Sequence, residues 1–361
     1  MADKDPLADI RERIDEIDTA VQELVSERAE CARKVAEIKR QLGDTEHFYR
    51  PEREAQVLRR VQERNQGPLS DEAIAGIFRE IMAVCLALEK PLKVAFLGPE
   101  GTYTHAAAVK HFGSQIESEP VASIEEVFRL VEAGGANFGV VPVENSSEGV
   151  INHTLDLFMK SSLTISGEVE LRIRHNLMTN AQDTSAIDRV YAHQQTLAQC
   201  RMWLDTNLPN AERIAVRSNA EAVIMASEHD RSAAIAGSMA AELYSLPVLY
   251  ADIEDEPDNT TRFVVIGKYK SPPSGADRTS LLVFAHNKPG SLFSLLEPLA
   301  KRNISMSNIE SRPSRRGVWE YVFFIDIDGH RDEQNVAEAI ADIEKASAMV
   351  TVLGSYPRAV L

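Results

Sequence analysis

The sequence predicts a multidomain protein with an all-α helical N-terminal domain, a two-lobed α/β domain and an α+β ferredoxin-like C-terminal domain. Three observations predict this fold class. Apolar residues recur at spacings of three and four in the first segment, strand-like runs alternate with helices in the second, and the third has a βαββαβ order. We place the domains at residues 1–91, 92–270 and 278–361, because 361 residues are too many for one ordinary core.

The N-terminal segment is predicted to contain three helices. The first runs to about Gln41, where Gly43 ends it, a second begins near Pro51, which suits a first turn, and a third follows Ser70, which can cap a helix starting at Asp71. The first helix carries a seam of apolar residues, namely Leu7, Ile10, Ile14, Ile17, Val21, Leu24, Cys31, Val35 and Ile38. Three such helices form a thin core for a monomer, which favours an intertwined dimer in which Cys31 is a buried hydrophobic residue.

Arg28 occupies a position of this seam, where side chains normally pack against a partner helix. An unpaired guanidinium is costly there, so the helix either contains a buried ion pair or directs a cation into an anion-binding pocket. Lys39 lies about three turns further on, roughly 16 Å away, whereas Arg11 lies roughly 25 Å in the other direction. Arg11 could therefore share a small ligand with Arg28 only if it came from a second copy of the chain. The alternative for Arg11 and Lys39 is pairing with nearby carboxylates on a solvated face.

The middle segment alternates short strands with helices. Two of its helices are expected to begin with capping boxes, in which Ser123 pairs with Glu126 and Ser218 with Glu221. Repeated strand–turn–helix units favour a largely parallel sheet and, at this length, two lobes with a cleft at the carboxyl ends of the strands. The strands are expected at residues 93–98, 138–143, 189–193, 213–218, 233–237 and 262–267.

The C-terminal segment follows a linker, residues 271–278, whose composition (SPPSGADR) is typical of a loop. Strands are expected at residues 279–285, 304–310, 318–326 and 349–352, and helices at 291–301 and 333–345. This βαββαβ order predicts a ferredoxin-like module.

Composition and missing motifs argue against several classes of function. The net charge of −16 argues against a nucleic acid or an anionic membrane as a partner. There is no apolar leader, no apolar run of roughly 18 residues and no cysteine pair with metal-ligand spacing, so a cytoplasmic protein without a metal is expected. The glycine motifs that bind dinucleotides or phosphates are also missing, so no cofactor is expected.

The helical segment carries several charged motifs: Arg11 with its apolar neighbours, Ser26-Glu27-Arg28, Lys39, and residues 50–54 (Arg-Pro-Glu-Arg-Glu). With the motifs described below, they make nearly the whole chain resemble the bifunctional chorismate mutase–prephenate dehydratase family of phenylalanine biosynthesis. The resemblance implies that Arg28, Arg53 and Arg11 of a partner subunit hold the two carboxylates of chorismate. It also implies that Lys39 contacts a carboxylate and the ether oxygen, and that Glu54 accepts from the substrate hydroxyl. Fixed cations suit this unimolecular rearrangement, which needs no nucleophile.

Two positions of the helical segment depart from the enteric members of the family, which carry Gln where we align Glu89 and Ser where we align Cys85. A carboxyl group at position 89 can donate to the ether oxygen only when it is protonated. We therefore hypothesise that burial raises the pKa of Glu89 and that mutase turnover falls as the pH rises. The alternative is that Glu89 merely ends a helix in solvent.

Three motifs of the middle segment, residues 98–103 (GPEGTY), 143–149 (VENSSEG) and 259–263 (NTTRF), resemble those of prephenate dehydratase. Such an enzyme removes a hydroxyl and a carboxylate, as CO2, so it must assist hydroxyl departure and desolvate the carboxylate. The resemblance implies that Thr261 hydrogen-bonds the leaving hydroxyl and that Arg262 contacts a substrate carboxylate. The other predicted site residues are Glu144, Asn145, Ser146, Phe263 and, from the second lobe, Gln199. Ala192 stands where enteric relatives carry Ser.

Residues 287–293 (NKPGSLF) and 310–313 (ESRP) resemble the two motifs of an ACT domain, a regulatory module that binds amino acids. Gly290 lets the α-amino and α-carboxylate groups of a ligand approach the backbone, and the helix N-terminus that follows favours a carboxylate. We expect L-phenylalanine to bind between two such modules and to close the dehydratase cleft. The predicted contacts are Asn287, Gly290, Ser291, Leu292, Glu310, Ser311, Arg312 and Pro313. The alternative is a module that serves only for dimerisation.

We therefore expect a homodimer or larger homo-oligomer that converts chorismate to prephenate and prephenate to phenylpyruvate, under inhibition by L-phenylalanine. Two alternatives stay open. Two-lobed α/β clefts of the periplasmic-binding-protein type also bind solutes, so the middle segment could be a metabolite sensor. The substrate of the cleft could also be arogenate, which would yield phenylalanine directly, although the fused mutase favours prephenate.

Overall fold

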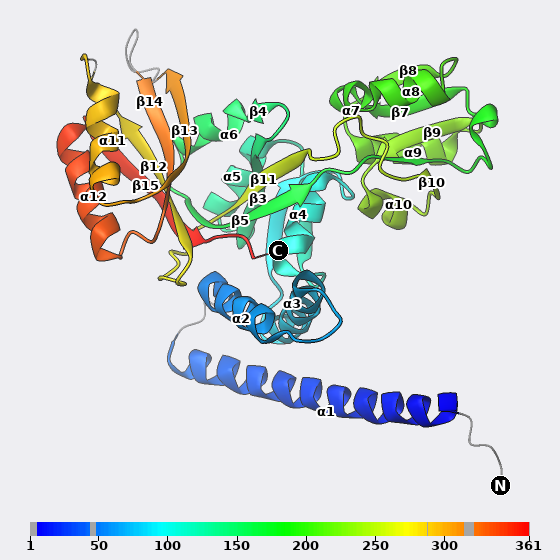
Figure 1. Cartoon of the computed structure of the whole chain (residues 1–361), viewed down its shortest axis with the longest axis horizontal. Coiled ribbons are helices and arrows are strands. Elements are labelled where there is room, and N and C mark those ends of the chain that lie inside the picture. Colours follow the sequence, from blue (N-terminus) through cyan, green and yellow to red (C-terminus); the bar gives the residue numbers. More distant parts are fainter. Residues whose placement is uncertain (1–5, 44–47, 287, 314–320, 361) are drawn as a thin grey trace.

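The computed structural model describes residues 6–43, 48–286, 288–313 and 321–360 (Figure 1). In this view the helical segment lies at the bottom, the two lobes of the middle segment in the centre and at the right, and the C-terminal segment at the left. The multidomain fold class predicted from the sequence is confirmed. None of the helices in the described ranges is both long and apolar enough to cross a membrane.

Three helices form the N-terminal segment: α1 (Pro6–Gln41), α2 (Pro51–Arg64) and α3 (Asp71–Ala87). Their ends match the sequence signals, since α1 stops just before Gly43 and the Ser70 hydroxyl caps α3 by accepting from the backbone N–H of Ala73 at 3.1 Å. Helices α2 and α3 pack on each other and under the rest of the molecule, whereas α1 lies beside them as a long separate rod (Figure 1).

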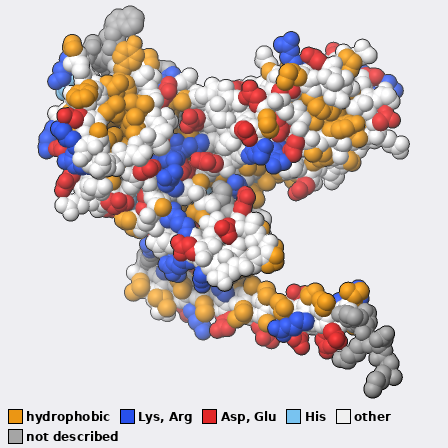
Figure 2. All heavy atoms as spheres, in the orientation of Figure 1, with side chains coloured by type: hydrophobic (Ala, Val, Ile, Leu, Met, Phe, Trp, Pro, Cys, Tyr) orange, Lys and Arg blue, Asp and Glu red, His pale blue; other side chains and the backbone are white. Residues whose placement is uncertain are grey.

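The apolar seam of α1 is exposed in a single copy of the chain. Ile14 and Leu24 are 49% and 65% exposed, and Figure 2 shows a row of hydrophobic side chains along this helix. Cys31 is exposed as well, so its expected burial is not met within one chain. A row of apolar residues this long is typical of a surface that packs against a partner.

The first lobe of the middle segment is built on a sheet with the strand order β2-β1-β3-β11-β5, in which β4 also pairs with β3. Its strands are β1 (Lys93–Leu97), β2 (Glu117–Val121), β3 (Phe138–Asn145), β4 (Gly149–Val150), β5 (Thr164–Arg172) and β11 (Thr260–Gly267). Its helices are α4 (Tyr103–Phe112), α5 (Ile124–Glu132) and α6 (Asn152–Phe158).

The second lobe has the strand order β10-β6-β9-β7-β8. Its strands are β6 (Asn176–Met178), β7 (Arg189–His193), β8 (Glu212–Val216), β9 (Ser232–Ala236) and β10 (Val248–Tyr250). Its helices are η1 (Thr184–Ala186), α7 (Gln194–Gln199), α8 (Arg201–Asn207), α9 (Asn219–Glu228) and α10 (Ser238–Tyr244). The chain enters this lobe after β5 and returns through β11, so two crossings join the lobes.

All six strands expected from the sequence are present, and both capping boxes are confirmed by the caps of Ser123 and Ser218. The expectation of largely parallel sheets is wrong. Strand β11 runs antiparallel to both β3 and β5, and β6 runs antiparallel to β9. The reason is the chain path: β11 comes back from the second lobe and enters the middle of the first sheet in the opposite direction.

The C-terminal segment has the ferredoxin-like order that the sequence predicts. Its elements are β12 (Asp277–Phe284), α11 (Ser291–Lys301), β13 (Met306–Pro313), β14 (Tyr321–Asp328), α12 (Gln334–Ala346) and β15 (Met349–Pro357). The sheet has the order β13-β14-β12-β15. One of its faces carries α11 and α12, whereas Leu282, Phe324 and Leu353 on the other face share a core with Val143 and Val264 of the first lobe. The two domains are therefore held together by a continuous apolar interface.

The β3–β11 pair has two functionally different faces. Thr261 is paired with Asn145, and Arg262 is paired with Glu144. Because side chains alternate along a strand, Thr261 and Asn145 point to one face of the sheet, and Arg262 and Glu144 point to the other. The face with Thr261 borders the space between the lobes, whereas the face with Arg262 is turned toward the C-terminal domain.

Candidate active sites

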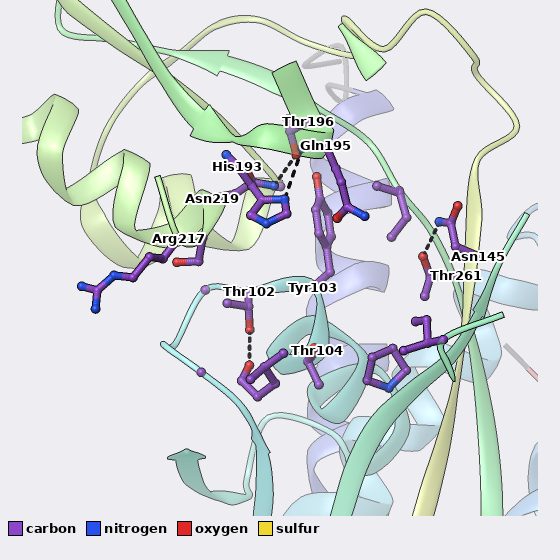
Figure 3. Close-up of a pocket in the computed structure, with 18 of the residues that line it drawn as sticks. Thr102, Tyr103, Thr104, Asn145, His193, Gln195, Thr196, Arg217, Asn219 and Thr261 are labelled. Carbon is purple, nitrogen blue, oxygen red and sulfur yellow. Dashed lines mark hydrogen bonds between the residues drawn. The ribbon is translucent and has the colours of Figure 1, made fainter. Parts of the chain in front are cut away.

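A cleft of about 1050 Å³ separates the two lobes of the middle segment. Thr102, Asn145 and Thr261 line it from the first lobe, and His193, Thr196 and Asn219 line it from the second (Figure 3). Within the described ranges, no three His, Cys, Asp or Glu side chains lie close enough together to hold a metal ion.

Asn145 holds Thr261 in place at the first-lobe side of the cleft. The Asn145 amide Nδ2 donates to Thr261 Oγ1 at 2.8 Å and to Asn259 Oδ1 at 2.7 Å (Figure 3). Its Oδ1 accepts from the backbone N–H groups of Ser147 and Glu148, both at 3.0 Å, which fixes the orientation of the amide. Since the Thr261 oxygen already accepts a hydrogen bond, its own proton is available for a group bound in the cleft.

A chain of polar side chains crosses the cleft from the first lobe to the second. The Tyr103 hydroxyl lies 2.8 Å from Nδ1 of His175, and Nε2 of His175 lies 2.7 Å from Oε1 of Gln199. An amide oxygen only accepts, so Nε2 carries the imidazole proton and Nδ1 faces the Tyr103 hydroxyl. Burial lowers the pKa of His175, which keeps the ring neutral.

Glu148 joins the two lobes directly. Its carboxylate, in the turn after β3, accepts from Nε2 of Gln195 and, at 3.1 Å, from Nε2 of Gln199, both on α7 of the second lobe. Gln199 was expected in the site from the sequence, whereas Tyr103, Glu148, His175 and Gln195 were not. Tyr103 and Glu148 lie inside the family motifs and could have been singled out, whereas His175 and Gln195 lie in no motif.

Arg262 and Glu144, two of the predicted cleft residues, point away from the cleft. They line a cavity of about 40 Å³ between the first lobe and the C-terminal domain. Arg262 donates from Nε to Glu168 at 3.0 Å, from Nη1 to Asp326 at 2.6 Å and from Nη2 to the Tyr356 hydroxyl at 2.9 Å. The alternation of side chains along β11 separates Arg262 from Thr261, so this geometry gives its guanidinium no contact with the cleft.

Three other positions of the cleft region have mainly structural surroundings. Phe263 borders the cleft and is buried in the core of the first lobe. Ser146 lies in the turn after β3, where its hydroxyl accepts from the backbone N–H of Thr260 at 2.9 Å. Ala192, where enteric relatives carry Ser, is fully buried in the second-lobe core.

The helical domain brings part of its predicted site together. Lys39 donates to the backbone carbonyl of Phe48 at 3.2 Å, and Arg40 donates to that of Glu89 at 3.1 Å. Burial raises the pKa of the Glu89 carboxyl, against the opposing charges of Lys39 and Arg40. Cys85 is buried one turn earlier, near the end of α3. By contrast, Arg11 is exposed and Arg28 half-exposed on the open face of α1.

Glu54 lies elsewhere, where the helical domain meets the two-lobed domain. Nε of Arg79 is 3.3 Å from Oε1 of Glu54, and both groups border a small cavity lined also by His111 and Glu168. Burial raises the pKa of Glu54 to about 7, although Arg79 opposes the shift. The neighbouring Arg53 is exposed on the other side of α2.

The two ACT-like motifs lie in different surroundings. Gly290 has a left-handed φ of +80° at the start of α11, and the Ser291 hydroxyl donates to the backbone carbonyls of the same loop, while Leu292 is exposed. Asn287 lies outside the described residues.

In the second motif, Arg312 donates to Asn152 at 2.6 Å and to Asp156 at 2.7 Å, both on α6 of the first lobe. Glu310 borders the same interdomain cavity as Arg262. Ser311 and Pro313 are exposed on β13. The second motif therefore contacts the first lobe within one chain, a placement that was not expected from the sequence.

Comparisons with known proteins match each of the three segments. The family model of chorismate mutase type II matches residues 10–90, that of prephenate dehydratase residues 94–271, and that of the ACT domain residues 279–345. The bifunctional chorismate mutase/prephenate dehydratase of Pseudomonas aeruginosa is 54% identical, with all of both chains covered. That of Aquifex aeolicus is 42% identical over 98% of this chain and 99% of the relative.

Among solved structures, prephenate dehydratase from Arthrobacter aurescens in complex with L-Phe is similar, with a TM-score of 0.68 and 35% identity. The match covers 74% of this chain and 90% of that one. The full-length relatives cover nearly the whole chain, and the three family models match consecutive parts of it. The chain belongs to the family of bifunctional chorismate mutase/prephenate dehydratases.

Proposed function

We propose that this protein converts chorismate to prephenate in its helical domain and prephenate to phenylpyruvate in the cleft, and that L-phenylalanine inhibits it through the C-terminal domain. The observation that carries the proposal is the cleft in which Asn145 holds the Thr261 oxygen and leaves its proton free. The family to which the chain belongs supports both activities. The test is phenylpyruvate formation from purified prephenate, with and without L-phenylalanine, alongside prephenate formation from chorismate.

In the dehydratase reaction, Thr261 hydrogen-bonds the hydroxyl that leaves the ring. The bond between the ring and the carboxylate breaks as CO2 departs, its electron pair completes the aromatic ring, and the C–O bond breaks with the hydroxyl accepting a proton. A donor fixed at the leaving oxygen stabilises the charge that develops there. Contacts of Glu148 with Gln195 and Gln199 close the lobes over the substrate and exclude water from the departing carboxylate.

The substrate carboxylates are held at helix N-termini rather than by Arg262. Thr102 and Tyr103 at the start of α4, and Ser218 and Asn219 at the start of α9, line the cleft from opposite lobes. Backbone N–H groups and the positive end of the helix dipole favour anions at such positions. A dianionic substrate therefore gains contacts to both lobes when the cleft closes.

The mutase reaction takes place at a site that two copies of the chain complete. In this proposal Arg28 and Lys39 come from one copy and Arg11 from the other, because Arg11 lies too far along the same straight helix to share a small ligand with Arg28. Support comes from the exposed apolar seam of α1, which a second α1 helix would cover. We propose a homodimer or larger homo-oligomer in the cytoplasm, where the free Cys31, Cys85 and Cys200 stay reduced.

Sedimentation tests the assembly. Ile17→Asp places a charge in the seam and should convert the dimer to a monomer that lacks mutase activity but keeps dehydratase activity. Glu23→Gln, an exposed change on the same helix, serves as the matched control. A wild-type protein that is monomeric and an active mutase would contradict the two-chain site.

A further inference from the structure

A buried ion cluster connects the catalytic strand pair to the C-terminal domain. Two arginines and two carboxylates form it: Glu168 on β5, Arg262 on β11, Arg278 on β12 and Asp326 on β14. The four side chains are at most 13% exposed. Two cations and two anions balance, and each domain contributes one of each sign. Pairing of buried charges is what makes such a cluster stable, so separating the domains would leave its members incompletely paired.

Arg262 stands at the centre of this cluster. Its guanidinium binds Glu168 within its own domain, and Asp326 and the fully buried Tyr356 hydroxyl across the interface. The Ser280 hydroxyl bonds both Asp326 and Tyr356, which fixes the C-terminal partners in turn. All three guanidinium nitrogens are thus used, and the planar fork fixes the direction of the side chain.

Arg262 is also one peptide bond away from the group that faces the substrate. Thr261 precedes it on β11, and the residues opposite this dipeptide on β3 are Asn145 and Glu144. The hydrogen bond between Asn145 and Thr261 is 2.8 Å long, so a small movement of β11 relative to β3 changes the position of the Thr261 hydroxyl. Displacements of this size at a catalytic donor are enough to change turnover strongly.

We propose that Arg262 is a positioning residue that ties β11 to the C-terminal domain and transmits movement of that domain to Thr261 and Asn145. The inference rests on the proposed dehydratase activity and its inhibition by phenylalanine. It replaces the expectation that Arg262 touches a substrate carboxylate. Arg262 pairs with Glu168 within its own domain and with Asp326 across the interface, so a movement of the C-terminal domain would break the second pair and leave the first.

Asp326→Asn tests the tie from the C-terminal side, at a residue that lies outside the cleft. The enzyme assay measures kcat and KM for prephenate with and without phenylalanine, and calorimetry measures phenylalanine binding to the full-length protein. We expect the factor by which phenylalanine lowers kcat/KM to shrink about fivefold or more, while the phenylalanine dissociation constant changes less than about twofold. Basal kcat should fall and KM should stay close to the wild-type value.

Two other Asp→Asn variants make the result specific. Asp342→Asn removes a similar ion pair, to Arg302 at 2.6 Å, inside the C-terminal domain and should behave like wild type. Asp156→Asn weakens a different interdomain contact, to Arg312, in which the first-lobe partner lies on α6 instead of on the catalytic strands. Loss of coupling in Asp156→Asn with wild-type coupling in Asp326→Asn would overturn the proposal and assign the transmission to Arg312.

The outcomes separate this inference from the proposed function. A wild-type protein that forms no phenylpyruvate, or that ignores phenylalanine, would overturn the proposed function. A wild-type protein that does both, with unchanged kcat and coupling in Asp326→Asn, would overturn the role of Arg262. If Asp326→Asn fails to fold, Tyr356→Phe removes one hydrogen bond to Arg262 while keeping the ring, and the same two measurements decide.

Discussion

The cleft and the helical domain differ in how much of a site one copy of the chain completes. In the cleft, Thr261, Asn145 and Asn259 are already joined by hydrogen bonds, and Glu148 connects them to the second lobe. On α1, Arg11 and Arg28 lie on an open face next to an exposed apolar seam, and the ion pairs found along the described part of this helix involve other arginines.

This difference is what we expect if the helical site is shared between two copies of the chain. A site inside one domain appears as a closed network of donors and acceptors on rigid strands, whereas a site between two copies appears as cations without anions and apolar residues without cover. Hydrated cations cost little by themselves, but a long exposed row of apolar residues is unusual on a free surface, and cations beside such a row are consistent with a missing partner. The first prediction below tests whether the helical site belongs to one chain or to two, and the others test single residues in the cleft and in the helical domain.

The largest expected effect concerns Arg28 and Arg11. Arg28→Ala or Arg11→Ala should each lower mutase turnover about a thousandfold, because each removes a charged donor from the site. Co-expression of the two variants should restore about a quarter of wild-type activity, since random pairing makes half the dimers mixed and each mixed dimer has one intact site. The measurement is the rate of chorismate consumption.

The control for this test is co-expression of Arg28→Ala with Lys39→Ala. Both residues belong to the same copy of the chain in a shared site, so no combination restores an intact site and activity should stay at the level of the single variants. Recovery of activity with this pair, or none with the Arg11 and Arg28 pair, would contradict a site shared in this way.

Thr261→Ala should reduce dehydratase turnover about a hundredfold and leave mutase turnover unchanged, because it removes one donor at the leaving hydroxyl. Thr261→Ser keeps the hydroxyl and should retain most of the activity. Phenylpyruvate formation from prephenate provides the measurement. Full activity of the Ala variant would show that the leaving group is assisted from elsewhere, and the cleft would lose its assigned donor.

The fold was predictable from the sequence wherever its signals are local. Gly43, Pro51 and Ser70 lie at helix ends, and the strands expected from apolar runs overlap observed strands. Strands β2, β4, β5, β6 and β10 of the two-lobed domain were not expected. Strand direction was not predictable, because β11 pairs with β3 and β5 only after the chain has passed through the second lobe. Pairings of this range depend on tertiary packing that no local pattern carries.

The site was predictable in part. Family motifs singled out Thr261 and Asn145, and the resemblance added Gln199 from the second lobe; all three line the cleft. The same motifs assigned Arg262 to the substrate, yet the period of a strand already separates it from Thr261. His175 could not be predicted, because a lone histidine just before a strand has no sequence signature. Its place in the site depends on hydrogen bonds to Tyr103 and Gln199, which are distant in the sequence.

A smaller effect is expected from Glu89. It tests whether the part of the helical site around Glu89 has its working protonation state in a single copy of the chain. Burial already raises the pKa of this carboxyl in one chain. If protonated Glu89 donates to the ether oxygen, mutase kcat should fall as pH rises through that pKa, by up to about tenfold per pH unit above it.

The measurement for Glu89 is mutase kcat between about pH 5 and about pH 8 for the wild type and Glu89→Gln. The amide donates at any pH, so the variant should give a flat profile. A flat profile for the wild type, or the same slope in both proteins, would contradict the role given to Glu89.

The smallest effect concerns Glu54, in the part of the helical domain that packs on the two-lobed domain without any partner chain. Its pKa rises from 4.5 to about 7 on folding, so the folded protein holds a proton that the unfolded chain releases. Stability from this group is therefore present at low pH and is lost as pH rises toward and through about 7, by roughly 3 kcal/mol at most.

Glu54→Gln should remove this dependence, so its thermal midpoint should fall less than that of the wild type between about pH 5 and about pH 8. Glu63→Gln, an exposed change on the same helix, should keep the wild-type slope. Parallel profiles for wild type and Glu54→Gln would mean that Arg79 keeps the carboxylate ionised and that α2 is docked by an ion pair.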